Sequence, residues 1–241
     1  MSESASLWGV PPGDYHENRY ACLLDRWITS GVRWLDLGAG SRLHGAWIGP
    51  SPEELAGRAS LLVGVDRHGP HMRANPQLTA AVLGDATALP FRRQSFDIVT
   101  ANMVVEHLED PLVVFEEVAR LLVPGGLFIV STPNLKNPIV RVSAWLLGAR
   151  ARKLASYVVE HRDLEHIFLT YYRCNSTKAF EGLARRSGMS IVESQTFSSY
   201  PFTKNYRGFV VLEGGLIRLL DLRPFRGARS NLAVVLRRCD D

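Results

Sequence analysis

The stretch RWLDLGAGSR, residues 33–42, runs an apolar, strand-like segment directly into two glycines that stand one residue apart. A strand that ends in a glycine turn is typical of sheets that bind a nucleotide-like ligand at their carboxyl edge. Asp36 stands two residues before the first of these glycines, Gly38. A carboxylate there would repel phosphate groups, so the stretch predicts a fold and also restricts the ligand.

Short apolar runs alternate with helical patterns from this stretch onward. Strands are predicted at Val32–Leu37, Leu61–Asp66, Ala80–Leu83, Phe96–Ala101 and Leu127–Ser131. A helix is predicted over Pro111–Val123, because its apolar residues recur at helical spacing and Pro124-Gly125-Gly126 follows it. Such alternation predicts βαβ crossovers and a parallel, doubly wound α/β sheet.

Further elements are predicted on both sides of this region. The predicted helices are Asp14–Thr29, with Leu23, Leu24, Trp27 and Ile28 turned inward, Asn137–Gly148 and Asn175–Ser187, and the predicted strands are Met189–Phe197 and Asn231–Arg238. Gly208–Leu222 is also apolar, and we favour a helix packed on the sheet. The alternative is a helix that touches a membrane peripherally, because three arginines follow it, Arg223, Arg226 and Arg229.

Composition indicates an ordinary globular chain. Of its 241 residues, 46% are hydrophobic and 22% charged, and no apolar run approaches the roughly 18 residues of a membrane span. The first twenty residues lack the pattern of a secretion signal, and the three cysteines lack metal-ligand spacing, so we expect reduced thiols and a cytoplasmic location. The net charge of +4 permits a polyanionic partner, but the basic residues form no single block, which favours a solvated surface.

The residues of the glycine loop discriminate between ligands. A dinucleotide fingerprint requires a third glycine where Leu43 stands, and Asp36 would oppose a pyrophosphate. S-adenosylmethionine has no phosphate, and its sulfonium and α-ammonium groups are cationic. Asp36 would attract such a ligand, while the backbone of Gly38, Ala39 and Gly40 packs against its methionine part.

Three other strand ends agree with this ligand. Asp66 ends the second strand, where an acid accepts hydrogen bonds from ribose hydroxyls, and we assign its neighbour Arg67 to the same site. Asp85 and Ala86 follow the third strand and are predicted to meet the adenine amino group and ring edge. The fourth strand ends with Asn102 and Met103, which are predicted to line the floor beside the sulfonium.

The motifs LDLGAG, VGVD, GDATALPF, FDIVTANMVVEHLEDP and LVPGGLFIVSTPN together resemble those of class I S-adenosylmethionine-dependent methyltransferases, in the branch of small-molecule and quinone-ring enzymes. The resemblance is close over about residues 30–135 and looser over 160–197 and 231–238. It implies a Rossmann-like sheet of seven strands, the last antiparallel, flanked by helices. Arg42 departs from the pattern by replacing a small residue, and Ser41–Ala59 is longer and less helical than the usual first crossover.

We expect one methyltransferase domain over residues 1–241. Within it we expect an N-terminal helical cap at 1–31, a cofactor-binding core at 32–132, substrate-side additions and the sixth strand at 133–230, and the last strand at 231–238.

His107, just past the fourth strand, is the best-placed candidate general base for an acceptor that must lose a proton, and the alternative is that its imidazole caps or packs the loop, as imidazoles often do. We interpret Glu106 as structural, bonding loop amides. In EHRDLEHIFLTYYR, residues 160–173, four side chains suggest metal ligands, namely His161, Asp163, Glu165 and His166. We favour a polar lid over a metal site. By resemblance, His166, Tyr171 and Tyr172 face the acceptor, with packing on the core as the alternative for the tyrosines, and we assign catalytic roles to His107, His166 and Tyr171.

The sequence therefore predicts transfer of a methyl group from S-adenosylmethionine, leaving S-adenosylhomocysteine, to a small or lipid-like acceptor. We favour oxygen as the acceptor atom, with nitrogen or carbon as alternatives, and expect neither a metal nor nucleic acid. One alternative is a nucleic-acid methyltransferase, although ANMVVEHL differs from the N/D-P-P-Y loop that grips a flipped base. The other is a non-catalytic cofactor-binding or scaffold protein, because methyl transfer requires no particular residue. A dehydrogenase is disfavoured by Asp36 and Leu43.

Overall fold

A computed structural model describes residues 14–147, 169–199 and 207–240 of the chain. These residues contain a seven-stranded sheet in the order β3-β2-β1-β4-β5-β7-β6. The strands are β1 (Val32–Leu37), β2 (Ala59–Asp66), β3 (Ala80–Leu83), β4 (Phe96–Asn102), β5 (Leu122–Pro133), β6 (Met189–Phe197) and β7 (Asn231–Arg238). The first five pair in parallel, and β7 is antiparallel to both of its neighbours. The predicted fold class is thus confirmed.

The topology reverses at β1, which determines where a ligand can bind. β1 pairs with β2 on one side and with β4 on the other, so successive crossovers run in opposite directions from it. In doubly wound sheets the crevice at such a switch point opens at the carboxyl ends of the strands. The ends of β1, β2, β3 and β4 therefore face one common region.

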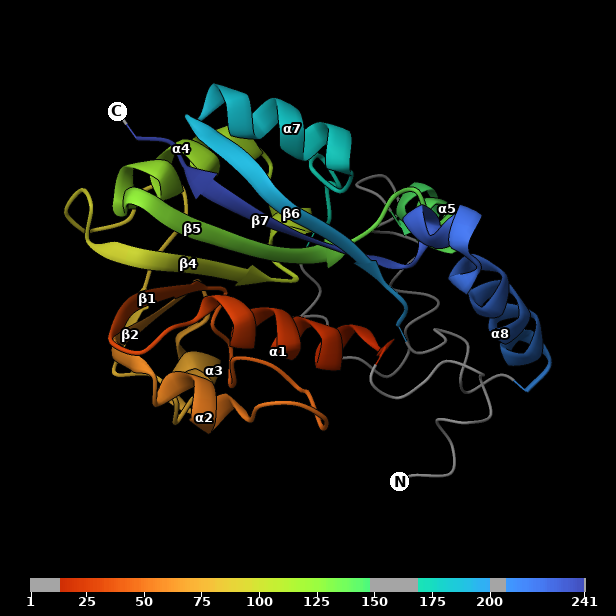
Figure 1. The fold of residues 1–241 in the computed structure, drawn as a ribbon, viewed down its shortest axis with the longest axis horizontal. Helices are drawn as coiled ribbons and strands as arrows, with labels where there is room; N and C mark the ends of the chain where they lie inside the picture. The colour runs from red at the N-terminus through yellow and green to blue at the C-terminus, as the bar shows by residue number, and fades with distance from the viewer. Residues whose placement is uncertain (1–13, 148–168, 200–206, 241) are drawn as a thin grey trace.

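Helices cover both faces of the sheet, as Figure 1 shows. On one face lie α1 (His16–Trp27), α2 (Pro52–Ala56) and α3 (Gly69–Arg73), and on the other lie α4 (Pro111–Leu121) and α7 (Thr177–Arg186). Beyond the carboxyl edge stand α5 (Pro138–Leu147) and α8 (Arg207–Asp221), with the short 3₁₀ segments η3 (Val105–His107) and η5 (Arg223–Ala228) in the connections.

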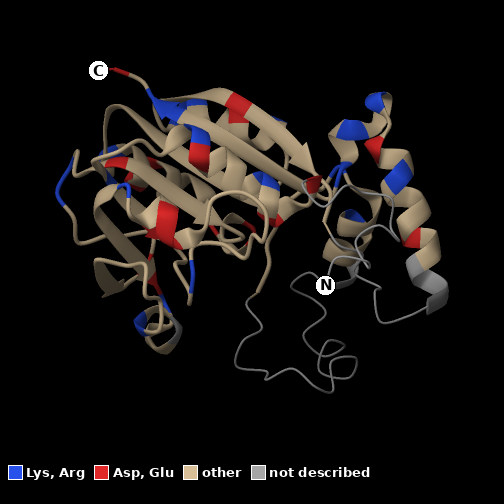
Figure 2. Cartoon of the chain, turned by 60° about the horizontal axis from the view of Figure 1, so that its bottom comes forward, with Lys and Arg blue, Asp and Glu red and all other residues tan. Residues whose placement is uncertain are grey.

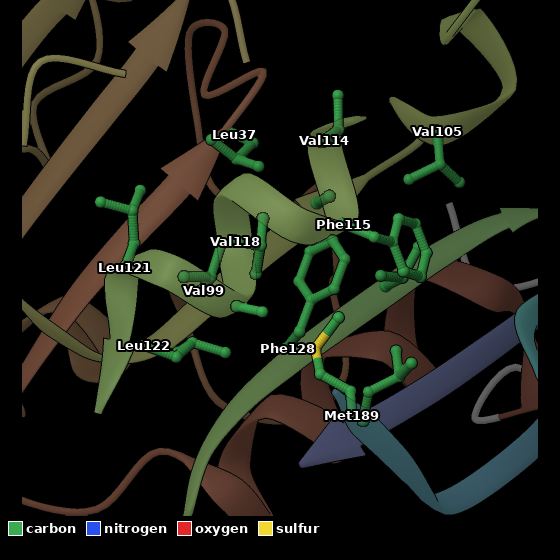
Figure 3. Packing of buried hydrophobic residues seen from close by; sticks show 14 of the residues in the cluster. Leu37, Val99, Val105, Val114, Phe115, Val118, Leu121, Leu122, Phe128 and Met189 are labelled. Atoms are coloured by element: carbon green, nitrogen blue, oxygen red, sulfur yellow. The ribbon is translucent and has the colours of Figure 1, made fainter. Parts of the chain in front are cut away.

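Each face of the sheet buries its own apolar cluster. On the α4 face, Phe115 packs edge-on against Phe128 of β5, with ring centroids 5.3 Å apart (Figure 3). The Phe115 ring also lies tilted against that of Phe180 in α7. On the other face, the residues predicted to turn inward from α1 are buried over Trp34, namely Leu23, Leu24 and Ile28, while Trp27 is half-buried.

Two element boundaries differ from prediction near Pro124. The helix α4 ends at Leu121, two residues before the predicted end, and β5 begins at Leu122, well before the predicted Leu127. Val123 precedes a proline, and the proline ring disfavours helical geometry in the residue before it. The chain therefore becomes extended before the Pro-Gly-Gly segment, not after it.

The favoured interpretation of Gly208–Leu222 as a helix on the sheet is wrong. The inner side of α8, with Glu213 and Ile217, lies against Ile139 at the start of α5 and against the connections that hold Ser199 and Ser230. α8 therefore covers loops at the carboxyl edge (Figure 1). Within the described ranges, no helix combines the length and apolar character needed to cross a bilayer.

Candidate functional site

The loop after β1 passes so close to the end of β4 that a side chain does not fit. Gly38 has φ +66°, and its amide donates to the carbonyl of Val65 at 2.7 Å. A Cβ atom on Gly38 would lie 2.4 Å from Cγ2 of Val104. Glycine satisfies both the left-handed backbone and the close approach, which is why the loop can close over the strand ends.

Two polar side chains from outside the loop hold it in place. Asp66, at the end of β2, accepts from the Gly40 amide at 3.1 Å and from the His68 amide at 2.8 Å. Asn75, in the segment after α3, donates from Nδ2 to the carbonyl oxygens of Ala39 at 3.0 Å and Gly40 at 3.4 Å. Sequence analysis missed Asn75, since the pair Asn75-Pro76 by itself indicates only a turn.

A cleft of about 770 Å³, counted with its open mouth, lies at the strand ends. Seven predicted cofactor residues line it: Gly38, Asp66, Arg67, Asp85, Ala86, Asn102 and Met103. The other lining residues are Leu37, Val65, Gly84, Val104, His107 and Leu108. Apart from His107, which was predicted as a base, these were missed. Each adjoins or lies close to a predicted residue, so whole strand ends are the better sequence signal.

Asp36, Ala39 and Gly40, also predicted to bind the cofactor, are absent from that lining. Asp36 lies on the α1 face with Trp34, because alternate residues of a strand point to opposite faces. Thr100 Oγ1 donates to Asp36 Oδ1 at 2.5 Å, and Trp34 Nε1 donates to Thr100 Oγ1 at 2.7 Å. Burial raises the pKa of Asp36 to about 7, against the Thr100 hydrogen bond, which lowers it. Direct contact between Asp36 and a cationic ligand remains a prediction.

The ends of β2 and β3 are joined by an ion pair. Arg67 donates to Asp85 across the rim of the cleft, and Thr87 donates to Asp85 from its amide at 2.9 Å and its hydroxyl at 2.8 Å. Burial alone would raise the pKa of Asp85, but the hydrogen bonds from Thr87 and Arg67 outweigh it and hold the pKa below its usual value. Asp85 is therefore an ionised acceptor at neutral pH. Arg42, the departure in the glycine loop, is exposed and does not line the cleft.

The end of β4 combines backbone strain with an unsatisfied polar atom. Met103 has φ +57°, uncommon for a residue with a side chain, and its amide donates to the carbonyl of Ser131 at 2.8 Å. Within the part of the chain that the structure describes, the buried Oδ1 of Asn102 accepts no hydrogen bond. Buried polar atoms are almost always paired, so this oxygen is a candidate acceptor for a ligand bound in the cleft.

His107 lies in η3 and lines the cleft. Its Nδ1 is 2.9 Å from the carbonyl oxygen of Leu169. A carbonyl cannot donate, so Nδ1 carries the proton, and Nε2 of the neutral ring is the acceptor. Burial lowers the pKa of His107, and the hydrogen bond to Leu169 only partly opposes this. The imidazole is therefore neutral at pH 7 and chemically able to accept a proton.

The sequence predicts that Glu106 bonds loop amides, and among the described residues the amide that its carboxyl group meets is its own. Its buried carboxyl group accepts from the Thr132 hydroxyl at 3.0 Å, and burial raises its pKa to about 7. The backbone carbonyl of Glu106 accepts from the amides of Tyr171 at 2.7 Å and Tyr172 at 3.1 Å. A structural role is consistent with these contacts, which tie η3 to the segment at 169–172.

The second predicted cluster is only partly described. The Tyr171 ring lies below the Arg173 guanidinium, 5.5 Å from ring centroid to Cζ, in a hollow beside the cleft that Trp145 and Tyr172 also line. Tyr171 and His107 thus belong to connected segments but to different hollows. His161, Asp163, Glu165 and His166 lie outside the described residues. Among the described ones, no three His, Cys, Asp or Glu side chains gather as a metal site.

Comparison with known proteins agrees with this geometry. A family model described as a methyltransferase domain matches residues 35–130. A demethylmenaquinone methyltransferase of Mycobacterium sp. (strain KMS) is 33% identical over 166 residues, which span 66% of this chain and 66% of that relative. A ubiquinone biosynthesis O-methyltransferase of Cereibacter sphaeroides (strain ATCC 17029 / ATH 2.4.9) is 31% identical over 137 residues, 52% of each chain.

Solved structures share the fold. An S-adenosylmethionine-dependent methyltransferase from Mesorhizobium loti superposes with a TM-score of 0.61 at 18% identity, over 95% of this chain and all of that one (100%). The seven-stranded sheet and its order are thus those of a known architecture.

Proposed function

The chain belongs to the class I S-adenosylmethionine-dependent methyltransferases, and we propose that it moves a methyl group from S-adenosylmethionine to an oxygen of a small or lipid-like acceptor. The observation that carries the proposal is the set of hydrogen-bond acceptors in the cleft. Asp66, Asp85 and the unsatisfied Oδ1 of Asn102 are all acceptors. Among the described residues that line the cleft, Arg67 is the one basic side chain with a fixed charge, and it is paired with Asp85. A cationic ligand with ribose and adenine donors suits this set, whereas a pyrophosphate does not.

The cleft residues fit S-adenosylmethionine in the order of their strands. Gly38 and its loop would pack against the methionine part, Asp66 would accept from the ribose, and Asp85 with Ala86 would meet the adenine. Asn102 and Met103 would border the reactive end. When bound, the cofactor supplies a methyl group already activated by its sulfonium, so the chain's main task is to align the acceptor with it.

The choice of oxygen rests on His107 and on the name of one relative, the O-methyltransferase of ubiquinone biosynthesis. A hydroxyl acceptor must lose a proton, and a neutral imidazole in the cleft can take it. The name of the other relative, a demethylmenaquinone methyltransferase, gives no acceptor atom, and both names refer to quinones. We extend this acceptor class to the present chain as part of the proposal, together with a cytoplasmic location and one methyltransferase domain.

Replacing Asp66 tests the cofactor assignment. Asp66→Ala is expected to weaken S-adenosylmethionine binding by about 1–3 kcal/mol, since it leaves buried donors without their acceptor. Isothermal titration calorimetry measures this. Asp25→Ala is the matched control, because this exposed aspartate of α1 pairs with Arg58 and does not line the cleft. It should not change the affinity. Equal affinities for both variants, or tight binding of NAD(H) by the unmodified chain, would contradict the assignment.

Replacing His107 tests the proposed base. His107→Ala is expected to slow turnover by roughly 10²–10⁴-fold and leave cofactor affinity unchanged, because general-base catalysis contributes about that much. Turnover of the unmodified chain should fall as the pH drops below the lowered pKa of His107, where the ring becomes charged. The acceptor is found by screening cell extracts by mass spectrometry for products that gain one labelled methyl group. A variant with full turnover would return His107 to a packing role.

The same assays decide between the remaining alternatives. Formation of S-adenosylhomocysteine only when an acceptor is present excludes a non-catalytic binding protein. A nucleic-acid methyltransferase would instead bind RNA or DNA with an affinity that falls steeply as salt is added. Figure 2 shows Lys and Arg segments interspersed with Asp and Glu segments over the sheet and its flanking helices. This mixture of charges favours the small-molecule acceptor over a nucleic acid.

A further inference from the structure

The helix α8 has two apolar sides, and one of them faces solvent. Its inner side is buried at Ile217 and Leu220, whereas Val211 and Leu212 are 70% and 73% exposed and Leu219 is also exposed. At about 100° per residue, these three exposed positions fall within an arc of about 100°. Single exposed apolar residues are normal, but a continuous stripe indicates a surface that something covers.

Two more exposed apolar side chains follow the helix. Leu222 and Phe225, in the connection to η5 and in η5 itself, are also exposed. We call the five residues together the α8 stripe: Val211, Leu212, Leu219, Leu222 and Phe225. Figure 1 shows α8 beyond the carboxyl edge of the sheet, beside α5.

The exposed charged side chains within the described residues 211–228 are basic. These are Arg218, Arg223 and Arg226, and Figure 2 shows basic segments on this unit together with acidic ones. The two acids of the segment are directed elsewhere. Glu213 is buried, and Asp221 forms an ion pair with Arg229 at 2.7 Å.

We propose that the α8 stripe docks on the surface of an anionic lipid bilayer, with α8 lying in the plane of the interface. A helix with an exposed apolar side and flanking arginines binds in this way, since its apolar side chains enter the acyl boundary and its cations meet anionic headgroups. A second copy fits less well. Pairing two identical stripes about a two-fold axis would bring the same three arginines of each copy together, and like charges repel.

This inference goes beyond the proposed function and does not depend on it. The test uses the full chain in flotation assays with two kinds of vesicle, phosphatidylcholine alone and phosphatidylcholine mixed with phosphatidylglycerol. We expect binding to the anionic vesicles that weakens as salt is added, because exposed charges are screened. This comparison needs no substitution, so it is decisive even if a variant folds poorly.

Substitutions then locate the contact. Leu212→Glu should weaken binding by roughly tenfold or more, since it removes one buried leucine from the membrane contact. Arg223→Glu should weaken binding to anionic vesicles by roughly 25-fold, because each cation near such a surface contributes about fivefold and the reversal changes the charge by two. Val192→Glu, at an exposed apolar residue of β6, is the matched control and should bind like the unmodified chain.

Circular dichroism of each variant separates loss of fold from loss of the contact. Failure of the unmodified chain to bind either vesicle would overturn the proposal, as would equal binding by Leu212→Glu and Val192→Glu. Light scattering that shows a dimer which Leu212→Glu dissociates would assign the stripe to a second copy instead.

Discussion

At Gly38, the loop after β1 has no room for even a methyl side chain. The residue combines φ +66° with a neighbour, Val104, that would touch any Cβ atom at 2.4 Å. Gly40, two residues further on, has φ +45°. A Cβ atom there would meet only the Gly38 carbonyl oxygen within 4 Å, at the ordinary contact distance of 3.9 Å. The two glycines of the loop therefore serve different purposes. Gly38 allows a close approach and Gly40 allows only a backbone conformation.

Alanine at each glycine should separate these purposes. Gly38→Ala is expected to lower the free energy of unfolding by roughly 2–4 kcal/mol, from backbone strain plus overpacking, whereas Gly40→Ala should cost about 1 kcal/mol from strain alone. Urea unfolding measures both.

Adding Val104→Ala should restore part of the stability lost in Gly38→Ala, since it removes the atom that the new Cβ meets. Absence of any rescue in the double variant would show that the clash is not the cause.

At the scale of elements, the cleft depends on contacts between connecting segments that are far apart in the sequence. Asn75, between α3 and β3, holds the loop of β1 through two carbonyl groups. Glu106 in η3 holds the segment at Tyr171 through its own carbonyl, and His107 holds Leu169. The cofactor side and the proposed acceptor side are thus each braced by one short connection.

Removing the Asn75 amide should loosen the cofactor side. Asn75→Ala is expected to lower the free energy of unfolding by about 1–3 kcal/mol and to weaken S-adenosylmethionine binding, because the carbonyls of Ala39 and Gly40 lose a buried donor. Chemical unfolding and calorimetry measure the two effects. Gln77→Ala, which removes an exposed side-chain contact to Glu53 in the same segment, is the control and should change neither by more than about 0.5 kcal/mol. Equal effects of the two substitutions would contradict the bracing role.

For the whole molecule, two buried acids link stability to pH. The pKa values of Asp36 and Glu106 are both raised to about 7, mainly by burial. In the unfolded chain these groups lose their protons near their ordinary values of 3.8 and 4.5. Between those values and about pH 7 the unfolded state therefore binds fewer protons than the folded state. The contribution of these acids to stability is present at low pH and is lost as the pH rises through 7.

Neutral substitution should remove part of this dependence. Glu106→Gln is expected to make the free energy of unfolding fall less steeply between about pH 5 and 7, and to raise it at pH 8 by roughly 1–3 kcal/mol. Thermal and urea unfolding across pH measure this.

Glu117→Gln is a control of opposite sign, because the Arg120 side chain lowers the pKa of Glu117. It should destabilise the protein at neutral pH by about 1 kcal/mol. A loss of stability at pH 8 in both variants would contradict the raised pKa of Glu106.

The residues alone predicted the strands and the edge at which they end. Hydrophobic period and glycine position are local properties, so β1, β3, β6 and β7 have their predicted bounds, and most of the cleft lining follows from residues at strand ends. The end of α4 was misplaced because the proline effect at Val123 was not applied, although it too is local.

Only the tertiary structure decided which side of β1 Asp36 faces, that Asn75 reaches the glycine loop, and that η3 joins the segment of Tyr171. It also placed α8 over the carboxyl-edge loops with an apolar side exposed. Each of these depends on contacts between residues distant in the chain. A pattern of neighbouring residues records what a segment prefers to form, but not which other segment will satisfy its hydrogen bonds or cover its apolar side.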